Sequence, residues 1–336
     1  MKAMVLEAVG SPLALKELSI PEPGSGEVLV KVMACGVCPT DVKVIQGAGP
    51  KARLPVVLGH EAAGEVVKVG SGSDFKVGQR VVIHPHIYCG RCQNCIEGME
   101  SVCMNIRGSM GFTMNGGLAE YTVSPSSNLV LFPNTVSFED GALAGGTVAV
   151  PFSAIRKLGS VMSRWVLVLG LGALGLNALQ ILRAAGANVV AVGRKKPKLD
   201  LAKSLGAAEV FDSTKGDYSE FARKVTGQGV DAALDMAGAA AEIPHLLKSL
   251  RRGGRLVVVG YSSGNFEAPY QAVVTDGLQI IGSRSYSRQD LRGAVELVTI
   301  GKVKPQIDSR FTLEKTNDAL AAVREGKLIG RAVVTP

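Results

Sequence analysis

Four cysteines are crowded into one short stretch of the chain. Cys89, Cys92, Cys95 and Cys103 are separated by two, two and seven residues. In a reducing compartment such crowding indicates a metal and not disulfides, and four thiolates close a tetrahedral zinc shell with no open position. An iron–sulfur cluster also takes four thiolates, but its usual cysteine spacings differ from this one. The spacing predicts structural zinc, and the alternative is a lobe that is emptied or oxidised.

A glycine fingerprint follows a predicted strand. After the apolar residues 165–169, the chain reads Gly170-Leu-Gly172-Ala173-Leu174-Gly175 and continues with helical spacing. In this context Gly170 is expected to make a tight turn, Gly172 to admit a pyrophosphate, and Gly175 to let helix and strand pack closely. The helix N-terminus offers amides to the phosphates. We predict a dinucleotide site at these residues, against the alternative of a glycine turn in another βαβ unit.

The end of the next predicted strand bears on which nicotinamide cofactor is bound. An acidic residue there would accept hydrogen bonds from the ribose hydroxyls, but the chain has Gly193, Arg194 and Lys195. Gly193 makes room, and Arg194 offers a forked donor that suits a 2′-phosphate. The sequence therefore favours NADP(H) over NAD(H). The alternative is that these cations are only solvated side chains at the start of the next helix.

Two different patterns of apolar residues along the chain predict the architecture. Residues 1–150 are rich in Val, Gly and Pro, with short apolar runs at 28–33, 65–69 and 80–83, which is typical of a β-rich domain. From about residue 153, apolar strands alternate with helices, which indicates a doubly wound parallel sheet of the Rossmann type. The tail lacks this alternation and could return to the first domain. The predicted strands are 166–169, 189–192, 210–211, 230–234, 256–259, 279–281 and 332–334, and the predicted helices are 173–185, 198–205, a segment near 242–250, 290–300 and 317–324.

The composition favours a globular enzyme. The 336 residues are 46% apolar and 20% charged, and the net charge of +8 is spread along the chain, with short clusters only at 194–196 and 251–252. A phosphorylated cofactor accounts for this charge as well as a nucleic acid would. No apolar run has the length of a membrane span, and Glu7 lies where a secretory signal would be apolar. We expect a cytoplasmic protein with small-molecule partners, no nucleic acid and no membrane.

A resemblance covers essentially the whole chain. The run from Gly59-His60-Glu61 to Gly70 resembles the signature of zinc-containing medium-chain alcohol dehydrogenases, and residues 77–81, the cysteine lobe, the glycine fingerprint and residues 330–334 also match that family. The resemblance implies a GroES-like catalytic domain from residues 1–152 and 286–336, and a Rossmann NAD(P)-binding domain from 153–285. It also implies a homodimer or homotetramer.

The family's catalytic zinc is held by a cysteine, a histidine and a third residue, with water or substrate oxygen completing the shell. Cys38 and His60 match the first two ligands, and Asp41 matches the carboxylate that orients the histidine. Glu61 matches a glutamate beside the metal that can enter its shell. Thr40 matches the hydroxyl that passes the substrate proton outward.

Three departures from the family pattern qualify this resemblance. The third ligand is expected near residues 145–147, where the chain reads Gly-Gly-Thr, so Glu61 is the most plausible substitute. Pro39 replaces a residue that commonly contacts the pyrophosphate, and Lys43 stands where some relatives keep a relay histidine, although Arg331 still matches a pyrophosphate contact. The pocket residue ahead of the lobe is replaced within His84-Pro85-His86, where His86 resembles a substrate-side histidine of the threonine and polyol dehydrogenase branch.

Other polar residues have simpler interpretations. Cys35 is expected to be a small buried hydrophobe, His84 to face solvent or backbone, and His245 to be structural. Asp235, at the end of a predicted strand, could support the sheet end or contact cofactor. Gly260, after the strand at 256–259, is expected to contact the cofactor.

The sequence predicts reversible oxidation of secondary alcohols and reduction of ketones, by an NADP(H)-preferring enzyme with catalytic and structural Zn²⁺. Pro85 in place of a bulky aromatic suggests bulky or cyclic substrates. One alternative is a reductase of quinones, enones or enoyl thioesters that does not use zinc for chemistry. Another is an NADPH-binding protein without turnover.

Overall fold

The computed structural model describes residues 1–336 and divides into two compact units. The first consists of Met1–Ala149, Tyr286–Gly301 and Pro305–Pro336, and the second of Val150–Ser285 and Lys302–Lys304. The predicted boundaries of a catalytic and a cofactor domain concern roles as well as geometry, and they stay a prediction. No helix is both long enough and apolar enough to span a bilayer.

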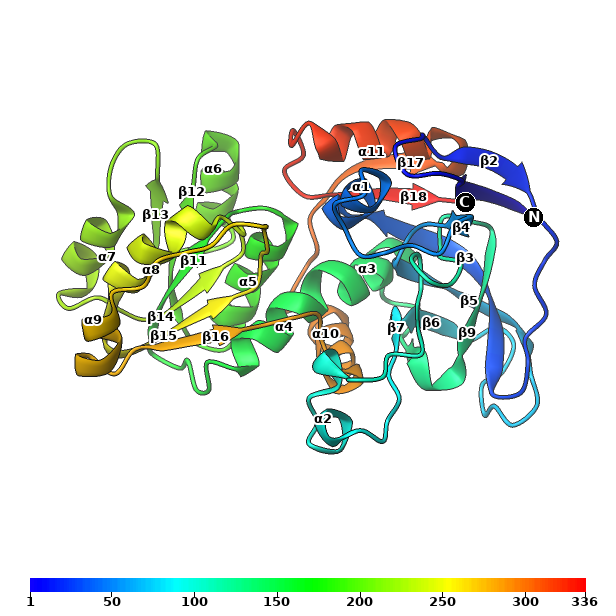
Figure 1. The fold of residues 1–336 in the computed structure, drawn as a ribbon, viewed down its shortest axis with the longest axis horizontal. Helices are drawn as coiled ribbons and strands as arrows, with labels where there is room; N and C mark the ends of the chain where they lie inside the picture. Colours follow the sequence, from blue (N-terminus) through cyan, green and yellow to red (C-terminus); the bar gives the residue numbers. More distant parts are fainter. The chain divides into compact units, whose positions relative to one another are not determined.

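The first unit is built on a seven-stranded, mainly antiparallel sheet (Figure 1). Its strands run in the order β10-β6-β5-β3-β18-β17, with β9 also paired to β3. The C-terminal strand β18 pairs with β3, so that Ala332 lies opposite Val37. The tail therefore completes the sheet of the first unit. The strands of this sheet are β3 (Glu27–Val37), β5 (Glu61–Val69), β6 (Arg80–Ile83), β9 (Tyr121–Pro125), β10 (Leu129–Leu131), β17 (Ile307–Thr312) and β18 (Arg331–Thr335).

Smaller elements surround this sheet. A three-stranded sheet has the order β2-β1-β4, and the pair β7/β8 lies at the base of the cysteine lobe. The strands are β1 (Lys2–Leu6), β2 (Ala14–Glu17), β4 (Val56–Val57), β7 (His86–Ile87) and β8 (Gly108–Ser109). The helices are α1 (Pro39–Ile45), α2 (Gln93–Ile96), α3 (Phe138–Leu143), α10 (Arg288–Thr299) and α11 (Thr316–Arg324).

The second unit is the predicted doubly wound sheet. Its six strands are all parallel and run in the order β13-β12-β11-β14-β15-β16, so the chain reverses direction across the sheet between β11 and β14. This 3-2-1-4-5-6 order is that of a Rossmann fold, in which a ligand lies beyond the carboxyl ends of the strands at the reversal. Leu167, Leu234 and Leu256 are fully buried at its centre because helices cover both faces of a parallel sheet.

The elements of this unit agree closely with the predicted runs. The sequence did not predict α4, α7 and α9. The strands are β11 (Trp165–Leu169), β12 (Asn188–Gly193), β13 (Glu209–Asp212), β14 (Val230–Asp235), β15 (Leu250–Val258) and β16 (Gln279–Gly282). The helices are α4 (Ala149–Arg156), α5 (Ala173–Ala184), α6 (Lys196–Ser204), α7 (Tyr218–Thr226), α8 (Ile243–Ser249) and α9 (Tyr270–Thr275).

The turn from β11 to α5 depends on glycine at two positions. Gly170 has φ +95°, a left-handed conformation that other residues rarely adopt, and a Cβ on it would lie 2.8 Å from the amide nitrogen of Ala237. A Cβ on Gly175 would lie 1.9 Å from the carbonyl oxygen of Gly170. Gly172 is different, because a Cβ there would meet nothing within 4 Å. Gly175 thus lets helix α5 approach the turn, and Gly170 lets the turn approach Ala237. Gly172 leaves open space beside the backbone.

This difference predicts the stability of two glycine variants. Gly175→Ala forces α5 away from Gly170, and overpacking of this kind costs about 1–3 kcal/mol. Gly172→Ala is the matched control, because its new methyl group has room. Thermal unfolding without cofactor is expected to show a lower melting temperature for Gly175→Ala only. Equal melting temperatures for the two variants would contradict the packing described here.

Candidate functional site

The cysteine lobe brings four sulfur atoms around one point. The Sγ–Sγ distances are 3.5 Å for Cys92–Cys95 and Cys103–Cys89, and 3.9 Å for Cys89–Cys95 and Cys92–Cys103. These distances are too long for disulfides, and all the cysteines are free. A tetrahedron with Zn–S bonds of about 2.3 Å has S–S edges of about 3.8 Å, so the four thiols fit a structural zinc ion.

Backbone amides support negative charge on these sulfurs. The amide of Cys92 donates to the Sγ of Cys89 over 3.3 Å, and the amides of Cys89 and Asn105 each donate to the Sγ of Cys103 over 3.4 Å. Backbone hydrogen bonds, first that of Met104, lower the pKa of Cys92 to about 6, and that of Arg91 lowers the pKa of Cys89. Burial raises the pKa of Cys95 to about 12. The lobe therefore favours thiolates, the form that binds metal, at Cys89 and Cys92.

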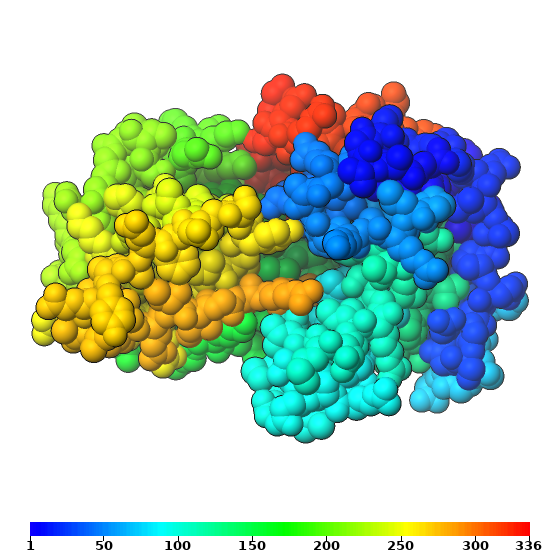
Figure 2. All heavy atoms as spheres, in the orientation of Figure 1, coloured from blue at the N-terminus to red at the C-terminus, as the bar shows by residue number.

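The lobe is exposed on one side and tied down on the other. Ile96 and Met104 are largely exposed. The lobe belongs to the cyan region of Figure 2. On the inner side the carboxylate of Glu100 accepts hydrogen bonds from the backbone amide and the Nε of Arg288, at 3.0 and 2.9 Å. This partly buried pair joins the lobe to the first residue of α10.

A second candidate metal centre lies at one end of the first unit's large sheet. The Sγ of Cys38, a ring nitrogen of His60 and a carboxylate oxygen of Glu61 all lie within 4.8 Å of one another. Cys38 directly precedes α1, and Pro39 takes the first helical position, where a missing N–H costs nothing. His60 directly precedes β5, and Glu61 is the first residue of that strand. Three donors from adjoining elements therefore converge on one point.

Asp41 connects two of these donors. Its fully buried carboxylate accepts a hydrogen bond from the backbone amide of Cys38 at 2.8 Å and lies 3.1 Å from the Nδ1 of His60. Burial lowers the pKa of His60. The charge of Asp41 and its hydrogen bond raise that pKa by more, so the net shift is upward. With Nδ1 held by Asp41, the Nε2 of His60 is the nitrogen left to bind a metal.

Glu61 has one engaged and one unengaged carboxylate oxygen. Its Oε1 accepts a hydrogen bond from Arg331 at 2.8 Å, in an ion pair that is almost completely buried. Its Oε2 is buried without a hydrogen-bond partner. Because a buried carboxylate oxygen without a partner is costly, Oε2 fits the role of a metal ligand.

Two glycines make the space that Glu61 occupies. A Cβ on Gly36 would lie 2.2 Å from the Oε2 of Glu61, and a Cβ on Gly146 would lie 2.1 Å from its carboxyl carbon. Gly146 belongs to a π-helical turn, η3 (Ala144–Val148), at the place where the third ligand was expected. The side chain of Thr147 donates to the carbonyl of Leu143 at 3.0 Å. The structure thus places Glu61 in the volume that a ligand side chain at position 146 would need.

The other predicted site residues of the first unit are Thr40, Lys43, His86 and Arg331. Thr40 and Lys43 are half-buried on α1, next to Cys38 and Asp41. The Nδ1 of His86 lies 3.0 Å from the hydroxyl of Ser109, at the start of the cysteine lobe. Arg331, predicted to contact pyrophosphate, has Glu61 as its immediate partner. That pyrophosphate role stays a prediction.

The residues with simpler interpretations also have clear places. Cys35 is fully buried in the core of the first unit, as a small hydrophobe would be. The expectation that His84 faces solvent or backbone is met by the backbone, because its ring nitrogens lie 3.0 Å from the carbonyl of His86 and 3.2 Å from that of Tyr286. Burial, acting first, lowers the pKa of His84 to about 4, so this residue is neutral. His245 is half-exposed on α8.

In the second unit, the predicted cofactor residues gather at the carboxyl ends of the strands. Gly170, Gly172, Ala173, Leu174 and Gly175 form the β11–α5 turn, and Gly172 caps the twelve-residue helix α5. Gly193 ends β12, and Arg194 and Lys195 follow it as exposed residues before α6. These elements present helix amides and cationic side chains at the reversal of the sheet, as a dinucleotide site requires.

Asp235 and Gly260 close the neighbouring strand ends. A carboxylate oxygen of Asp235 accepts hydrogen bonds from the amides of Ala237 and Gly238, both at 2.9 Å. Burial raises the pKa of Asp235. The amide of Gly260 donates to the backbone carbonyl of Asp235, and a Cβ on Gly260 would lie 2.3 Å from the nitrogen of Gly238. Of the two alternatives for Asp235, the contacts show support of the sheet end.

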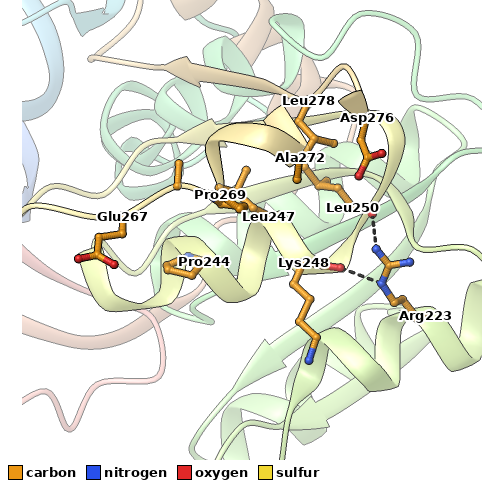
Figure 3. Close-up of a pocket in the computed structure, with 11 residues that line it drawn as sticks. Arg223, Pro244, Leu247, Lys248, Leu250, Glu267, Pro269, Ala272, Asp276 and Leu278 are labelled. Carbon is orange, nitrogen blue, oxygen red and sulfur yellow. Dashed lines mark hydrogen bonds between the residues drawn. The ribbon is translucent and has the colours of Figure 1, made fainter. Parts of the chain in front are cut away.

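A surface pocket of the second unit lies apart from these predicted residues. Its volume is about 520 Å³. Figure 3 shows the lining residues, which come from α7, α8 and the segment around α9. Arg223 crosses one end, where its guanidinium donates to the carbonyls of Lys248 and Leu250. None of the predicted site residues lines this pocket.

The sequence did not reveal that Gly36 and Gly146 make the space for Glu61. It also did not single out Tyr286. Tyr286 is almost fully buried, and its hydroxyl has no hydrogen-bond partner. Its pKa is raised by burial first, and then by the nearby charges of Tyr88, Glu61 and Cys38. No spacing motif links position 286 to position 38 or 61, so only the folded chain reveals this neighbourhood.

Comparisons with known proteins identify the family. Residues 24–134 match the alcohol dehydrogenase GroES-like domain, and residues 173–299 match the zinc-binding dehydrogenase domain. An alcohol dehydrogenase of Geobacillus stearothermophilus is 37% identical over 338 residues, covering 99% of this chain and 99% of that protein. The chain belongs to the zinc-containing medium-chain alcohol dehydrogenase family. The predicted fold class, GroES-like plus Rossmann, is confirmed.

Two further relatives bear on activity. A D-arabinose 1-dehydrogenase (NADP(+)) of Saccharolobus solfataricus is 33% identical, covering 100% of this alcohol dehydrogenase and 97% of that protein. A solved NAD-dependent alcohol dehydrogenase superposes with a TM-score of 0.93 at 34% identity, covering 100% of both chains. This family member is an oxidoreductase acting on CH–OH groups of small molecules, with zinc and a nicotinamide cofactor.

The packing of Gly146 against Glu61 gives a test of the second metal centre. Gly146→Ala places a methyl group where the carboxyl group of Glu61 lies, so Glu61 is displaced. We expect zinc affinity at this centre to fall about 10- to 100-fold, a loss typical of disturbed ligand support. Competition with a chromophoric chelator measures it.

Gly145→Ala is the matched control for this experiment. Its Cβ would lie 2.9 Å from Val82 and not against Glu61, so it is expected to lower stability without weakening zinc binding. Equal zinc affinity in the two variants would show that Glu61 contributes nothing to the centre.

Proposed function

We propose that this alcohol dehydrogenase interconverts secondary alcohols and ketones, with catalytic zinc held by Cys38, His60 and Glu61. The observation that carries this proposal is the convergence of these three donor atoms within 4.8 Å. One thiolate, one imidazole and one carboxylate suit zinc, and three protein ligands leave a fourth position open for substrate.

The chain's residues have distinct tasks in this proposal. When bound, zinc polarises the substrate oxygen and the nicotinamide exchanges a hydride with the substrate carbon. Asp41 fixes the ring of His60 through Nδ1, so that the imidazole meets the metal position in one orientation. Thr40 is proposed to carry the substrate proton toward solvent, and Lys43 to continue the relay. In support, both are half-buried residues of α1, which begins directly after Cys38. His86 is proposed to line the substrate side.

NADP(H) is proposed as the preferred cofactor. The β11–α5 turn binds the pyrophosphate, and Arg194 binds the 2′-phosphate beside Gly193. In support, β12 ends without a carboxylate to receive the ribose hydroxyls, and Arg194 is exposed at that end. Relatives are named for either cofactor, so the preference of this chain depends on its own residues.

Bulky or cyclic substrates are proposed because of Pro85. This residue is buried between His84 and His86, where an aromatic side chain would project farther. A smaller side chain at this place leaves room for larger groups on the substrate carbon.

A homodimer or homotetramer is also proposed. β16 is an edge strand of the parallel sheet, and an edge strand presents unpaired backbone groups. Nearby side chains are apolar and exposed, with Tyr270 at 84% and Val274 at 66% of their full accessibility. A second copy of the chain would cover this surface, and sedimentation analysis would measure the assembly.

Removing Cys38 tests the metal assignment. We expect Cys38→Ala to lose one of two zinc ions per chain and to abolish carbonyl reduction, because the remaining pair of ligands binds zinc weakly. Cys92→Ser is the matched comparison, since it removes a ligand from the lobe and not from this centre. Metal analysis of purified protein counts the ions, and one zinc per unaltered chain would instead support a reductase that does not use zinc for chemistry.

Removing Arg194 tests the cofactor preference. We expect Arg194→Ala to weaken NADPH binding about 10- to 100-fold, because a hydrogen bond to a charged group contributes about 1.5–3 kcal/mol, and to leave NADH binding unchanged. Lys196→Ala is the control, because Lys196 is an exposed cation already paired with Asp200 at 2.7 Å. Fluorescence titration gives both affinities, and equal weakening of the two cofactors would refute the preference.

A further inference from the structure

Tyr286 is a buried residue whose polar atom has no use in the folded chain. The residue is 3% exposed, and its hydroxyl makes no hydrogen bond. A buried hydroxyl without a partner costs about 1–3 kcal/mol. Phenylalanine would fill the same volume without this cost, so the hydroxyl requires an explanation other than packing.

The backbone of Tyr286 is held firmly from two sides. Its carbonyl oxygen accepts a hydrogen bond from the hydroxyl of Tyr88 at 2.9 Å and lies 3.2 Å from the Nε2 of His84. The rings of His84 and Tyr286 meet edge to face, with centroids 4.8 Å apart. The phenol therefore has a fixed direction.

The residues that flank Tyr286 add to this constraint. Ser285 has φ +47°, an uncommon conformation for a residue other than glycine. Ser287 and Asp290 form a reciprocal cap at the start of α10, with a hydrogen bond of 2.9 Å from the amide of Ser287 to Asp290. Arg288 is bound to Glu100. Local strain held by many contacts is characteristic of functional segments.

The segment that carries Tyr286 packs beside the second metal centre. Helix α10, which begins two residues after Tyr286, contacts η3, where a Cβ on Gly145 would lie 3.8 Å from Leu291 of α10. The next residue of η3, Gly146, lies against Glu61. Burial, followed by the charges of Tyr88, Glu61 and Cys38, raises the pKa of Tyr286 well above its usual value, so the phenol keeps its proton. It is therefore a hydrogen-bond donor without an acceptor. The Oε2 of Glu61 also lacks a partner, which shows that these two groups do not satisfy each other.

We propose that the hydroxyl of Tyr286 donates a hydrogen bond to the oxygen atom of the alcohol or ketone substrate, which makes Tyr286 a further catalytic residue. The inference rests on the proposed function, because it takes the substrate oxygen to lie beside Cys38 and Glu61. It assigns a use to the one polar atom of Tyr286 that the protein leaves unengaged. The proton stays on Tyr286, and Thr40 keeps its proposed role as the relay.

The chemical benefit of this hydrogen bond is electrostatic. Negative charge grows on a ketone oxygen as its carbon receives hydride, and a fixed donor in a site shielded from water stabilises that charge strongly. The neutral phenol suits this task because it adds no net charge to the crowded cluster of Cys38, Glu61, Asp41 and Arg331. Its fixed direction means that little reorganisation is needed during the reaction.

The decisive variant is Tyr286→Phe, which deletes only the hydroxyl. We expect kcat/KM for cyclohexanone, or for another ketone that the unaltered enzyme reduces, to fall about 100-fold or more. Binding of trifluoroethanol to the zinc-loaded protein with NADP⁺, measured by calorimetry, is expected to weaken about 10-fold, as loss of a hydrogen bond of about 1.4 kcal/mol implies. Zinc content and melting temperature are expected to stay unchanged or, for the melting temperature, to rise.

Tyr121→Phe is the matched control, because Tyr121 lies on β9 outside the proposed site. It is expected to leave both kcat/KM and trifluoroethanol binding unaltered. The inference is overturned if Tyr286→Phe keeps kcat/KM and trifluoroethanol affinity within about twofold of the unaltered protein. It is also overturned if the variant loses zinc or stability in proportion to its activity, because that result assigns a structural role.

The Cys38→Ala variant separates this inference from the proposed function. If Cys38→Ala abolishes reduction while Tyr286→Phe does not, the metal assignment holds and the role of Tyr286 is wrong. If Cys38→Ala keeps both zinc ions and full activity, the proposed function itself is wrong, and the inference that rests on it falls too.

Discussion

The hydrogen bonding of one buried carboxylate underlies the geometry of the second metal centre. Asp41 holds the backbone of Cys38 and the ring of His60 at the same time, so the end of β3 and the start of β5 are fixed relative to each other. A carboxylate can be fully buried only when its oxygens are engaged. Asp41 therefore orients both ligands, and it also depends on them.

Glu61 extends this arrangement across the sheet to Arg331. The ion pair balances the charge of one carboxylate oxygen, and Gly36 and Gly146 provide the space for the other. Removing one partner of a buried ion pair costs about 3–5 kcal/mol, because the other charge is left buried without compensation. Glu61 and Arg331 therefore depend on each other. Residues 145–147 therefore carry no ligand side chain at the place where the carboxyl group of Glu61 lies, because the two would occupy the same volume.

The parts of the structure that local sequence determines were predictable. The strand before Gly170, the glycine turn and the following helix are adjacent in sequence, and the spacing of Cys89, Cys92 and Cys95 already places their sulfurs together. Other features needed the fold. Tyr286 and Glu61 are far apart in the chain, and the fit of Glu61 against Gly146 depends on tertiary packing. Helix α7 was not predicted, although Asp217 caps it and Gly227 ends it in a left-handed conformation. The reason is that it buries only Tyr218, Ser219 and Ala222, so its sequence contains no apolar run.

The pairing of β18 with β3 has a consequence for how the protein is made. Arg331 follows Glu61 by 270 positions, and the whole of Val150–Ser285 lies between them. During synthesis from the N-terminus, the Rossmann unit leaves the ribosome almost complete while the large sheet of the first unit still lacks two strands. The counter-charge for Glu61 arrives with the last of these strands. For most of the time that the chain is being translated, the second metal centre therefore lacks the positive charge of Arg331.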